Sequence, residues 1–338
     1  MRRLGLRGRS RPWVVVEPEP EESEPLAEFG LHAVVFSWME ADVIEATVRS
    51  AFAQGCDRVL LVDNDSPDDT VAVAVAAGAE LARSYRTDGV DVPLMTRIGN
   101  EVVAEVSAAD GRPHIWWLRL DADEFVHGPR GLTVRQLLAG LDRRYRIVGT
   151  RYFNHFPATK PESLPGFHPA DLQPLCQEKD GNMCAGRHRK HHLQRFDRDL
   201  PPITSGIGFH RGYCDDTLLE PPVSTFTHHV PYRLEASTRA RFEALCGEGP
   251  SGRRRVDLYD HQIRVNAGTV SDMSKRHRTI DAVYSRRWND VENLLREGAS
   301  VGVEPAPWHS LVDPADATYS VWYDADDLAA AVADHARS

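Results

Sequence analysis

The chain has 338 residues, of which 41% are hydrophobic, and its 50 acidic residues outnumber its 40 Lys and Arg residues, for a net charge of −10. A chain of this length can bury a substantial core. The negative charge disfavours binding to a nucleic-acid backbone. The sequence contains no run of eighteen apolar residues, so it predicts no helix that crosses a membrane. The five cysteines are scattered and form no Cys-x-x-Cys pair, which favours a reduced, cytoplasmic protein.

The first 28 residues are polar, rich in Pro and Glu, and without a periodic apolar face. Their basic start is not followed by the apolar stretch that a secretory signal needs. We expect a disordered arm over residues 1–28.

Strand and helix patterns alternate from residue 31 onward. Ser66 is a suitable N-cap for the second helix, with Pro67 at its first position and Gly78 at its end. This alternation is typical of a doubly wound parallel sheet flanked by helices. The predicted elements are, in chain order, strand 31–36, helix 43–53, strand 56–62, helix 66–77, strand 79–85, helix 93–109 and strand 115–120.

The last of these strands leads directly into three carboxylates, Asp121, Asp123 and Glu124. Open α/β sheets bind ligands at the carboxyl ends of their strands. Clustered carboxylates repel one another unless a cation or a proton intervenes, and their hard oxygen atoms suit Mg²⁺ or Mn²⁺ shared with substrate phosphates. We therefore predict a metal and phosphate site here, with a solvated acidic loop as the alternative.

Three segments in this order resemble the family 2 glycosyltransferases and their relatives with an Asp-x-Asp-Glu-Phe motif. They run from Ser37 to Asp42, from Val62 to Thr70, and from Leu120 to Phe125. Each motif is weak alone, whereas three with the right order and spacing are specific. The resemblance covers about residues 31–246. It implies a GT-A fold with a Rossmann-like mixed sheet, a nucleoside diphosphate sugar donor, a divalent metal, and inversion at the anomeric carbon.

The resemblance also suggests how the chain is divided. We expect a GT-A domain over residues 29–246, with a nucleotide-binding half (29–130) and an acceptor half (131–246), and then a helical extension over 247–338. The second half predicts helix 134–141, strands 145–152, 192–196 and 223–229, and helices 280–295 and 319–336. The extension's Trp308, Trp322 and Tyr323 could cover the acceptor pocket or form a homodimer surface, and the sequence does not choose between these roles.

By this resemblance, the donor nucleotide contacts residues that follow the first two strands. The flat side chain of Trp38 suits stacking on uracil, with a core tryptophan as the alternative. Carboxylate and amide groups can accept hydrogen bonds from the base or the ribose. Met39 stands where many family members have Asn. The expected contacts are Ser37, Trp38, Glu40, Asp63 and Asn64.

The resemblance assigns metal binding to Asp123, which matches the direct ligand, and to Asp121, which matches an acid at the ribose or the outer metal shell. Glu124 would hold the site through hydrogen bonds. His229 ends a strand before an Arg-rich helix, and as a neutral imidazole it would complete the metal shell. The alternative for His229 is a strand-end histidine bonded to a carbonyl group.

Four side chains are expected to face the diphosphate. Arg97 and Asn100 lie on the predicted helix 93–109, although an Arg on such a helix can also be solvated. Lys190 belongs to a basic run that would bind phosphate or form a solvated patch. Arg233 follows the strand at 223–229 and can pair with a phosphate through two hydrogen bonds.

Residues 155–190 are rich in Pro, Gly, His and Lys without periodicity, and a loop this long is usually functional. We expect it to form a lid or part of the acceptor site. An inverting transfer needs a base, which we expect to be Asp215 or Asp216, with Asp197 and Glu178 as runners-up. A zinc cluster is disfavoured because its spacing matches no standard zinc pattern; its members would be Cys184, His188, His191 and His192.

The predicted function is metal-dependent transfer of a hexose, glucose in the first place, from a UDP-sugar to a hydroxyl of a small soluble acceptor. The acceptor would be a nucleoside, a sugar or a natural product, as in secondary metabolism. A nucleotidyltransferase acting on a sugar phosphate is an alternative, but it normally needs a Gly-rich basic loop after its first strand. A non-catalytic sugar-nucleotide-binding protein is the other alternative.

Overall fold

The computed structural model describes residues 24–87, 91–129, 132–156, 175–179, 190–206, 212–247, 273–285, 290 and 309–310. Several predicted features lie wholly or partly outside these residues. They are residues 1–23 of the arm predicted over 1–28, most of the loop over 155–190, the zinc-cluster members Cys184 and His188, the aromatic residues of the C-terminal extension, and the helix over 319–336.

The fold is built on four parallel strands in the order β4-β1-β2-β3. Strands β1, β2 and β4 contain apolar runs, and β1 is buried at every position, as a parallel strand covered on both faces must be. These strands confirm the predicted alternation up to residue 121. Strand β8 (Lys190–Asp197) pairs antiparallel with β4 and makes the sheet mixed. The four parallel strands are β1 (Gly30–Ser37), β2 (Arg58–Asp63), β3 (Glu80–Ser84) and β4 (His114–Asp121).

Beyond β8 the sheet continues through β6, β7 and β12. Strand β8 pairs with the first part of β6, and β11 pairs with its second part, parallel to it. Strand β11 also pairs antiparallel with β5. The segment predicted to be irregular contains β7, and the extension predicted to be helical contains β12. These strands are β5 (Glu124–His127), β6 (Ile147–Phe156), β7 (Leu175–Lys179), β11 (Thr225–His229) and β12 (His309–Ser310), with β9 (Thr204–Ser205) and β10 (Gly212–Tyr213) forming a separate pair.

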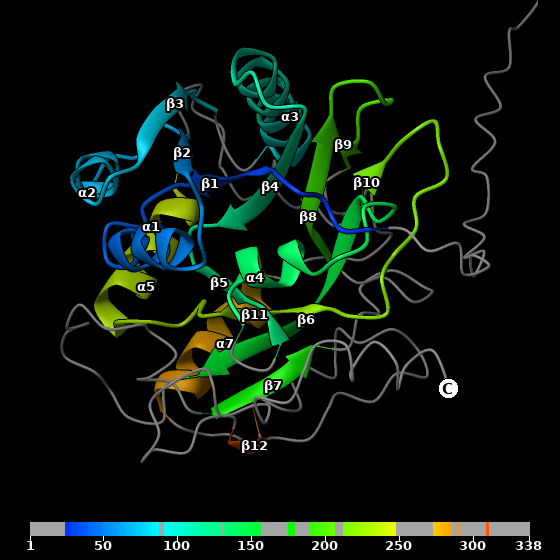
Figure 1. Ribbon diagram of the computed structural model, residues 1–338. Helices are drawn as coiled ribbons and strands as arrows, with labels where there is room; N and C mark the ends of the chain where they lie inside the picture. Colours follow the sequence, from blue (N-terminus) through cyan, green and yellow to red (C-terminus); the bar gives the residue numbers. More distant parts are fainter. Residues whose placement is uncertain are drawn as a thin grey trace, which may run out of the picture.

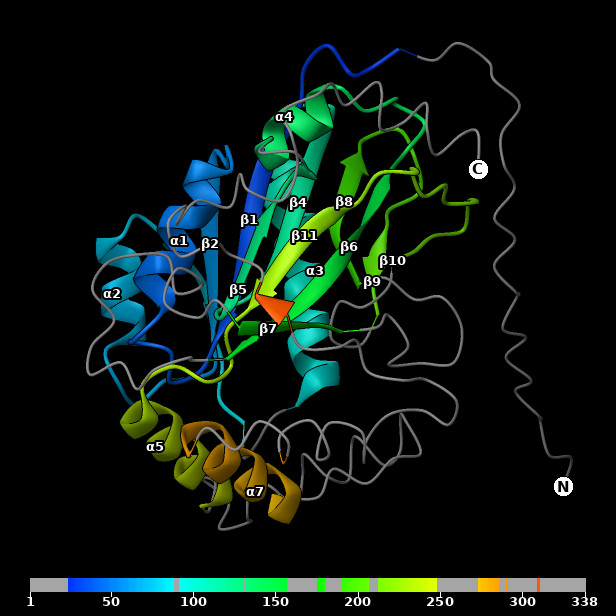
Figure 2. The same cartoon turned by 90° about the horizontal axis from the view of Figure 1, so that it is seen from below.

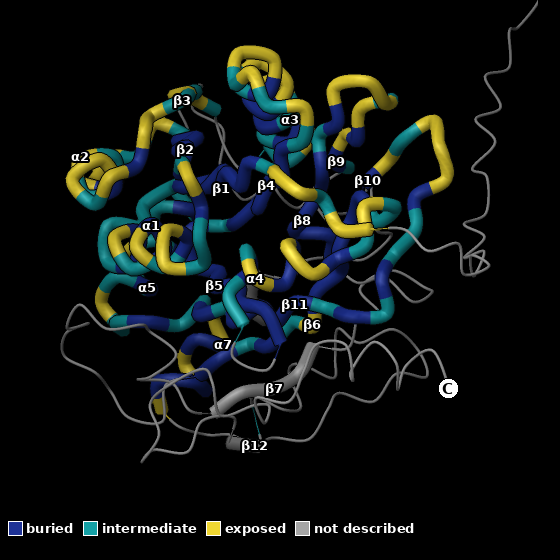
Figure 3. The backbone as a smooth tube through the Cα atoms, in the orientation of Figure 1, coloured by how far each residue is buried: buried dark blue, intermediate teal, exposed yellow. Residues whose placement is uncertain are grey.

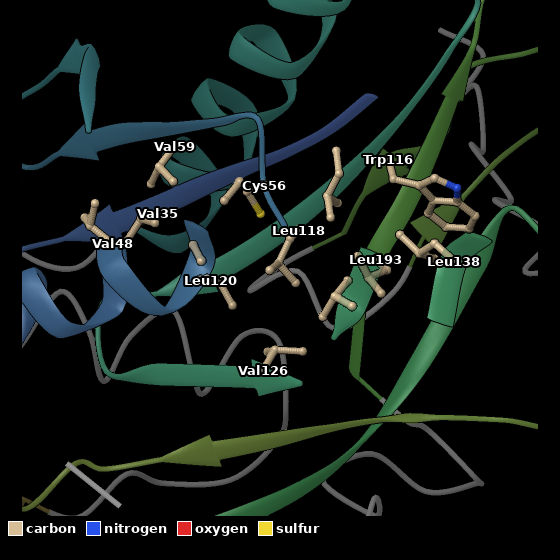
Figure 4. Packing of buried hydrophobic residues seen from close by; sticks show 14 of the residues in the cluster. Val35, Val48, Cys56, Val59, Trp116, Leu118, Leu120, Val126, Leu138 and Leu193 are labelled. Atoms are coloured by element: carbon tan, nitrogen blue, oxygen red, sulfur yellow. The ribbon is translucent and has the colours of Figure 1, made fainter. Parts of the chain in front are cut away.

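Side chains alternate between the two faces of the sheet, and each face carries its own helices. On β4, Trp116, Leu118 and Leu120 share a core cluster with α1, α2 and α4 (Figure 4). Ile115 and Trp117 on the same strand pack against α3. Figure 1 shows α3 on the opposite side of the sheet from α1 and α4. The helices are α1 (Ile44–Ala53), α2 (Thr70–Ala76), α3 (Val92–Ala109) and α4 (Val134–Ala139).

The resulting three layers bury the central strands, whereas the edge strand β3 and the outer faces of the helices are exposed (Figure 3). Helix α3 begins where predicted, because Asp91 accepts a hydrogen bond from the backbone N–H of Leu94 at 2.8 Å and Pro93 occupies the first turn. The predicted N-cap at Ser66 is wrong, since α2 begins at Thr70. Ser66 instead bonds to the loops that follow β1 and β2.

Two helices from the second half lie side by side, α5 (Glu235–Cys246) and α7 (Met273–Tyr284) (Figures 1 and 2). They are joined through a small core of Phe242, Ile280 and Tyr284. The helix predicted over 280–295 overlaps α7 only over residues 280–284, because α7 begins seven residues earlier; residues 286–289 and 291–295 lie outside the described residues. Within the described residues, no helix combines the length and apolar character needed to cross a membrane.

Candidate active site

The segments that resemble the glycosyltransferase motifs meet at one edge of the sheet, where β1, β2 and β4 end. Ser37 is the register partner of Asp63, and Phe36 is the partner of Asp121. Strand β11 ends nearby, because His229 pairs with Glu124 in the register of β5. The topology therefore brings the predicted nucleotide and metal residues to one carboxyl edge.

Asp123 is held by the segment that follows β11. Its carbonyl oxygen accepts from the backbone N–H of Val230 at 3.0 Å. Its Oδ2 atom lies 3.4 Å from Nε2 of His229 and 3.5 Å from Nη1 of Arg233. Burial would raise the pKa of Asp123, but His229 and Arg233 hold that pKa well below the usual range. Asp123 is therefore a carboxylate.

The orientation of His229 is fixed by Asn154 on β6. Nδ1 of His229 lies 2.7 Å from Oδ1 of Asn154, and because an amide oxygen accepts, the proton of this bond sits on Nδ1. A protonated His229 donates from Nε2 to Asp123, whereas in the neutral imidazole the Nε2 lone pair faces this carboxylate. Two acceptors 3.4 Å apart repel unless a proton or a cation lies between them.

This donor set fits a hard divalent cation. An imidazole nitrogen and a carboxylate oxygen point at a shared position, and Asn154 supplies the outer hydrogen bond that metal-binding histidines usually make. Among the described residues, no three His, Cys, Asp or Glu side chains are grouped so as to hold a metal by themselves. Mg²⁺ and Mn²⁺ accept such a partial set, because waters and substrate phosphates complete their coordination.

A buried lysine stabilises the rest of the acidic motif. Nζ of Lys190 lies 2.5 Å from Glu124 and 3.2 Å from Asp121, and the Tyr152 hydroxyl donates to Glu124 at 2.8 Å. Burial alone would lower the pKa of Lys190, but the two carboxylates raise it above its usual value. Lys190, which was expected to face phosphate, thus pairs with the motif's own acids. Asp121 stays partly open, with 42% of its side chain exposed.

Asp63 and Asn64 bind protein groups in this structure. Asp63 is 1% exposed and accepts from Ser37 Oγ at 2.7 Å and from Ser66 N and Oγ at 2.8 and 2.7 Å. Asn64 is half-buried and exchanges hydrogen bonds with Thr87, beyond β3. The buried Asp63 therefore holds Ser37 and Ser66 in place through hydrogen bonds, and the half-buried Asn64 lies closer to solvent.

The loops after β1 and β2 carry strained backbones where they touch. Met39 and Asp65 have φ values of +56° and +51°, in the left-handed region that side chains other than glycine seldom adopt. The backbone N–H of Met39 donates to Ser66 Oγ at 3.0 Å and ties the two loops together. Such strain is concentrated at functional sites. Trp38 lies half-buried beside this junction.

The two α3 residues expected to face the diphosphate contact other groups. Asn100 exchanges two hydrogen bonds of 3.0 Å with the backbone of Ser205 on β9. Arg97 is exposed and lies 3.5 Å from Glu101 in the next turn. These side chains line an open cavity of about 500 Å³ between α3 and β9. No contact joins either of them to Asp123 among the described residues.

The acids expected to supply the base lie at the other end of β4. Asp216 is exposed and lies 4.0 Å from Arg146, which also binds Asp197 at 2.8 Å. Asp197 is the register partner of His114, the first residue of β4. An eight-residue strand spans roughly 20–25 Å, so Asp216 is far from the motif at the carboxyl end. The structure does not bring Asp215 and Asp216 to the carboxyl edge where Asp123 lies.

Several residues of the edge have no role in the sequence-based prediction. Tyr152 and Asn154 are two residues apart on β6. Because side chains two positions apart in a strand lie on the same face, the sequence alone could have placed them together. Asp42 bonds to Arg233, and Arg241 bonds to Glu40, in contacts between distant parts of the chain. No local pattern indicates those two contacts.

Among solved structures, the chain is similar to glucosyl-3-phosphoglycerate synthase from Mycobacterium tuberculosis. The complex with Mn²⁺, UDP and glucosyl-3-phosphoglycerate is 20% identical, over 36% of this chain and 44% of that chain, with a TM-score of 0.24. The complex with Mn²⁺, UDP-glucose and phosphoglyceric acid is also 20% identical, over 36% and 43%, with the same TM-score. The chain thus covers less than half of these structures. No curated protein matches it.

The model of glycosyl transferase family 2 matches residues 33–217. This match begins in β1, includes the three motif loops and ends just after Asp216, so His229 and Arg233 lie beyond it. The fold agrees with the match, since a GT-A domain is a Rossmann-like mixed sheet between layers of helices. Because the match covers 185 of the 338 residues, the chain belongs to glycosyl transferase family 2 and is a glycosyltransferase.

Proposed function

We propose that this glycosyltransferase moves a hexose, glucose in the first place, from a UDP-sugar to a hydroxyl of a small polar acceptor, with inversion at the anomeric carbon. The family assignment leaves no reason to retain the nucleotidyltransferase or the non-catalytic binding protein. The observation that carries the proposal is the closeness of Asp123 Oδ2 and His229 Nε2, which lie 3.4 Å apart at the carboxyl edge and can both bind a cation when the imidazole is neutral. This pair is suited to a cation that also binds a diphosphate.

Asp123 and His229 would hold Mn²⁺ or Mg²⁺. When bound, such a cation offsets the negative charge that develops on the leaving diphosphate. The protein's own part is to hold these ligands in place before the donor arrives. Asn154 orients the imidazole, and the buried Lys190 pairs with Asp121, whose side chain is still partly exposed on the side where the ribose would bind.

We propose that the uracil base binds beside the loops that follow β1 and β2. The half-buried Trp38 offers a flat surface there, and Asn64 lies on the neighbouring loop. Asp63 supports these loops from inside through Ser37 and Ser66. A rigid edge of this kind favours a small pyrimidine over a larger guanine.

Nucleotide binding tests the proposal directly. We expect UDP to bind more tightly with Mn²⁺ than with EDTA in calorimetric titrations, because the cation links the diphosphate to Asp123 and His229. A thermal-shift series with UDP, GDP, ADP and uridine tests the base, since a ligand that binds the native state raises its midpoint. Equal UDP affinity in Mn²⁺ and EDTA, or a clear preference for GDP, would contradict the proposal.

The acceptor requires a separate experiment. We expect transfer to soluble sugars, nucleosides or natural-product hydroxyls, which product detection by mass spectrometry would reveal in a mixed acceptor panel. The stereochemistry of the new bond, read by NMR, tests inversion. Transfer to a polyprenyl phosphate in detergent, with none to the soluble panel, would overturn the soluble acceptor.

A further inference from the structure

Arg233 lies between the loop that follows β1 and the Asp123 carboxylate. The residue is 1% exposed and sits between β11 and α5. Its Nε and Nη2 atoms donate to the two oxygens of Asp42, each at 3.0 Å, and Nη2 also donates to Glu40. Nη1 donates to the carbonyl oxygen of Val230 at 3.2 Å and approaches Asp123 at 3.5 Å.

These contacts use the whole hydrogen-bonding capacity of the side chain. A guanidinium group has five N–H donors and no acceptor. One donor on Nε, two on Nη2 and two on Nη1 correspond to the five contacts of Arg233. No donor remains for a phosphate group. The phosphate contact expected for Arg233 is therefore not available in this arrangement.

A second arginine reinforces the same loop. Nη1 of Arg241, on α5, lies 2.6 Å from both carboxylate oxygens of Glu40, and its Nη2 donates to the carbonyl oxygen of Pro231 at 3.0 Å. Glu40, Asp42 and Asp123 carry three negative charges against the two positive charges of the arginines. The cluster thus has a net charge of −1, and a divalent cation at Asp123 would make it positive next to a diphosphate.

The backbone of Arg233 is held from the opposite side by the C-terminal part of the chain. The Tyr284 hydroxyl, at the end of α7, lies 3.0 Å from the Arg233 carbonyl oxygen and 2.7 Å from Thr238 Oγ1. Thr238 Oγ1 in turn accepts from the backbone N–H of Arg233 at 3.3 Å. Side chain and backbone of Arg233 are therefore both fixed.

We propose that Arg233 is a positioning residue for the metal ligand Asp123. Anchored by Glu40 and Asp42, it fixes the loop over residues 38–42 and the rotamer of Asp123 that faces His229. A buried network whose members are all paired is rigid, and ligand sites depend on such support. This inference rests on the proposed function, because it requires that Asp123 binds the cation.

A positioning role and a phosphate-binding role predict different results for Asp42, which bonds to Arg233 but not to Asp123. If Arg233 binds phosphate, Asp42→Asn frees an N–H donor of Arg233 and leaves metal binding intact. If Arg233 positions Asp123, Asp42→Asn releases its anchor and weakens metal binding as Arg233→Lys does. Lysine retains the charge but cannot reproduce the planar five-donor geometry.

The experiment measures Mn²⁺ affinity in saturating UDP from the electron paramagnetic resonance signal of free Mn²⁺, for Arg233→Lys, Asp42→Asn and the double variant. Each single change is expected to weaken Mn²⁺ binding about 10-fold or more, as outer-shell changes do. The double variant should lose little more than the stronger single one, because both changes act on one network. Residual UDP affinity in EDTA should match that of the wild type.

Arg49→Lys is the control, since Arg49 is exposed on α1 and pairs with Glu45 at the surface. Its Mn²⁺ affinity should equal that of the wild type. Tyr284→Phe retains the ring and removes one hydrogen bond to the Arg233 backbone, so it tests the same idea if Arg233→Lys does not fold. Thermal midpoints identify variants that fail to fold.

Mn²⁺ affinity of Asp42→Asn and Tyr284→Phe equal to that of Arg49→Lys would overturn the positioning role. So would a loss of UDP affinity in EDTA that is confined to Arg233→Lys, because that result assigns Arg233 to the phosphates. If the wild type itself binds no Mn²⁺ in the presence of UDP, the proposed function fails, and this inference fails with it.

Discussion

Among single residues, Asp123 is the one on which metal binding and transfer should depend most. Asp123→Asn retains the shape of the side chain but removes its charge, and we expect transfer to fall by roughly 100- to 1,000-fold, as when one charge-stabilising group of an active site is lost. The fold should survive, because Arg233 keeps Asp42 and Glu40 as partners. Initial rates and thermal midpoints measure both effects.

Asp216→Asn is the matched control for that experiment. It makes the same chemical change at an exposed acid near the opposite end of β4. We expect nearly wild-type rates, because no contact in the described part of the chain links Asp216 to the carboxyl edge. A loss of transfer as large as that of Asp123→Asn would show that Asp216 acts as the base and that the chain closes differently around its substrates.

His192 makes the stability of the fold depend on pH. Burial, and then the nearby charge of Lys190, lowers the pKa of His192 to about 3. In an unfolded chain, histidine titrates near about 6.5. The neutral side chain therefore stabilises the fold fully above about pH 6.5, and this stabilisation is lost as the pH falls toward 3, at up to about 1.4 kcal/mol per pH unit.

His192→Gln removes this titration. Its free energy of unfolding should fall less steeply than that of the wild type between about pH 6.5 and pH 4, the window between the two pKa values. Urea unfolding at several pH values measures both slopes. Parallel curves for the two proteins would show that His192 is not the group responsible.

At the scale of elements, Ser66 joins the loops after β1 and β2. Its hydroxyl donates to Asp63 and accepts from Met39, and Asp63 is buried. Ser66→Ala leaves a buried acceptor with one partner fewer, at a cost of about 1–3 kcal/mol in the free energy of unfolding. Ser84→Ala, on the exposed face of β3, is the control and should change that free energy by less than about 0.5 kcal/mol.

Urea unfolding of the two serine variants provides this comparison. UDP binding by Ser66→Ala should also weaken, because the same hydroxyl holds Met39 in its strained conformation. An unchanged unfolding free energy for Ser66→Ala would mean that water replaces the hydroxyl, and that the junction between the loops is not rigid.

The central elements could be predicted from the sequence because each carries its own signal. Strands β1, β2 and β4 contain apolar runs, and α3 has both an apolar stripe and a Pro in its first turn. Strand β5 has only four residues and depends on β11, whose partner residues lie about a hundred positions away. Such short strands are set by tertiary pairing and not by local propensity.

The position of the candidate site could be predicted from the sequence, but the ion pairs within the site could not. Motif order places the acids at the carboxyl edge, because parallel strands end there together. The nearest partner of a basic side chain is decided by side-chain geometry across the fold. Lys190 and Arg233 were both expected at phosphate, whereas each is surrounded by carboxylates of the protein itself.

At the scale of the whole molecule, α7 connects the C-terminal part of the chain to the site. Ile280 is 5% exposed and packs against Phe242 and Tyr284. Ile280→Ala should lower the free energy of unfolding by about 2–5 kcal/mol, the usual cost of a large-to-small change in a core. Val75→Ala, with the residue 50% exposed on α2, should cost less than about 0.5 kcal/mol.

Chemical unfolding curves of both variants measure this difference. If the small core between α5 and α7 stabilises only those two helices, Ile280→Ala should give an additional early transition, and not a shift of the single main one. A shift of the single transition would instead mean that α7, which lies in the extension predicted over residues 247–338, folds together with the rest of the domain.

The contacts that close the site join Glu40 to Arg233 and Arg241, over sequence separations of 193 and 201 residues. Contacts this distant form late, because the entropy of closing long loops must be overcome before they contribute. During synthesis, β1 and the loop after it are complete long before α5 has left the ribosome. In the nascent chain, Glu40 and Asp42 therefore lack their arginines until α5 has been synthesised, and only then can the contacts around Asp123 be completed.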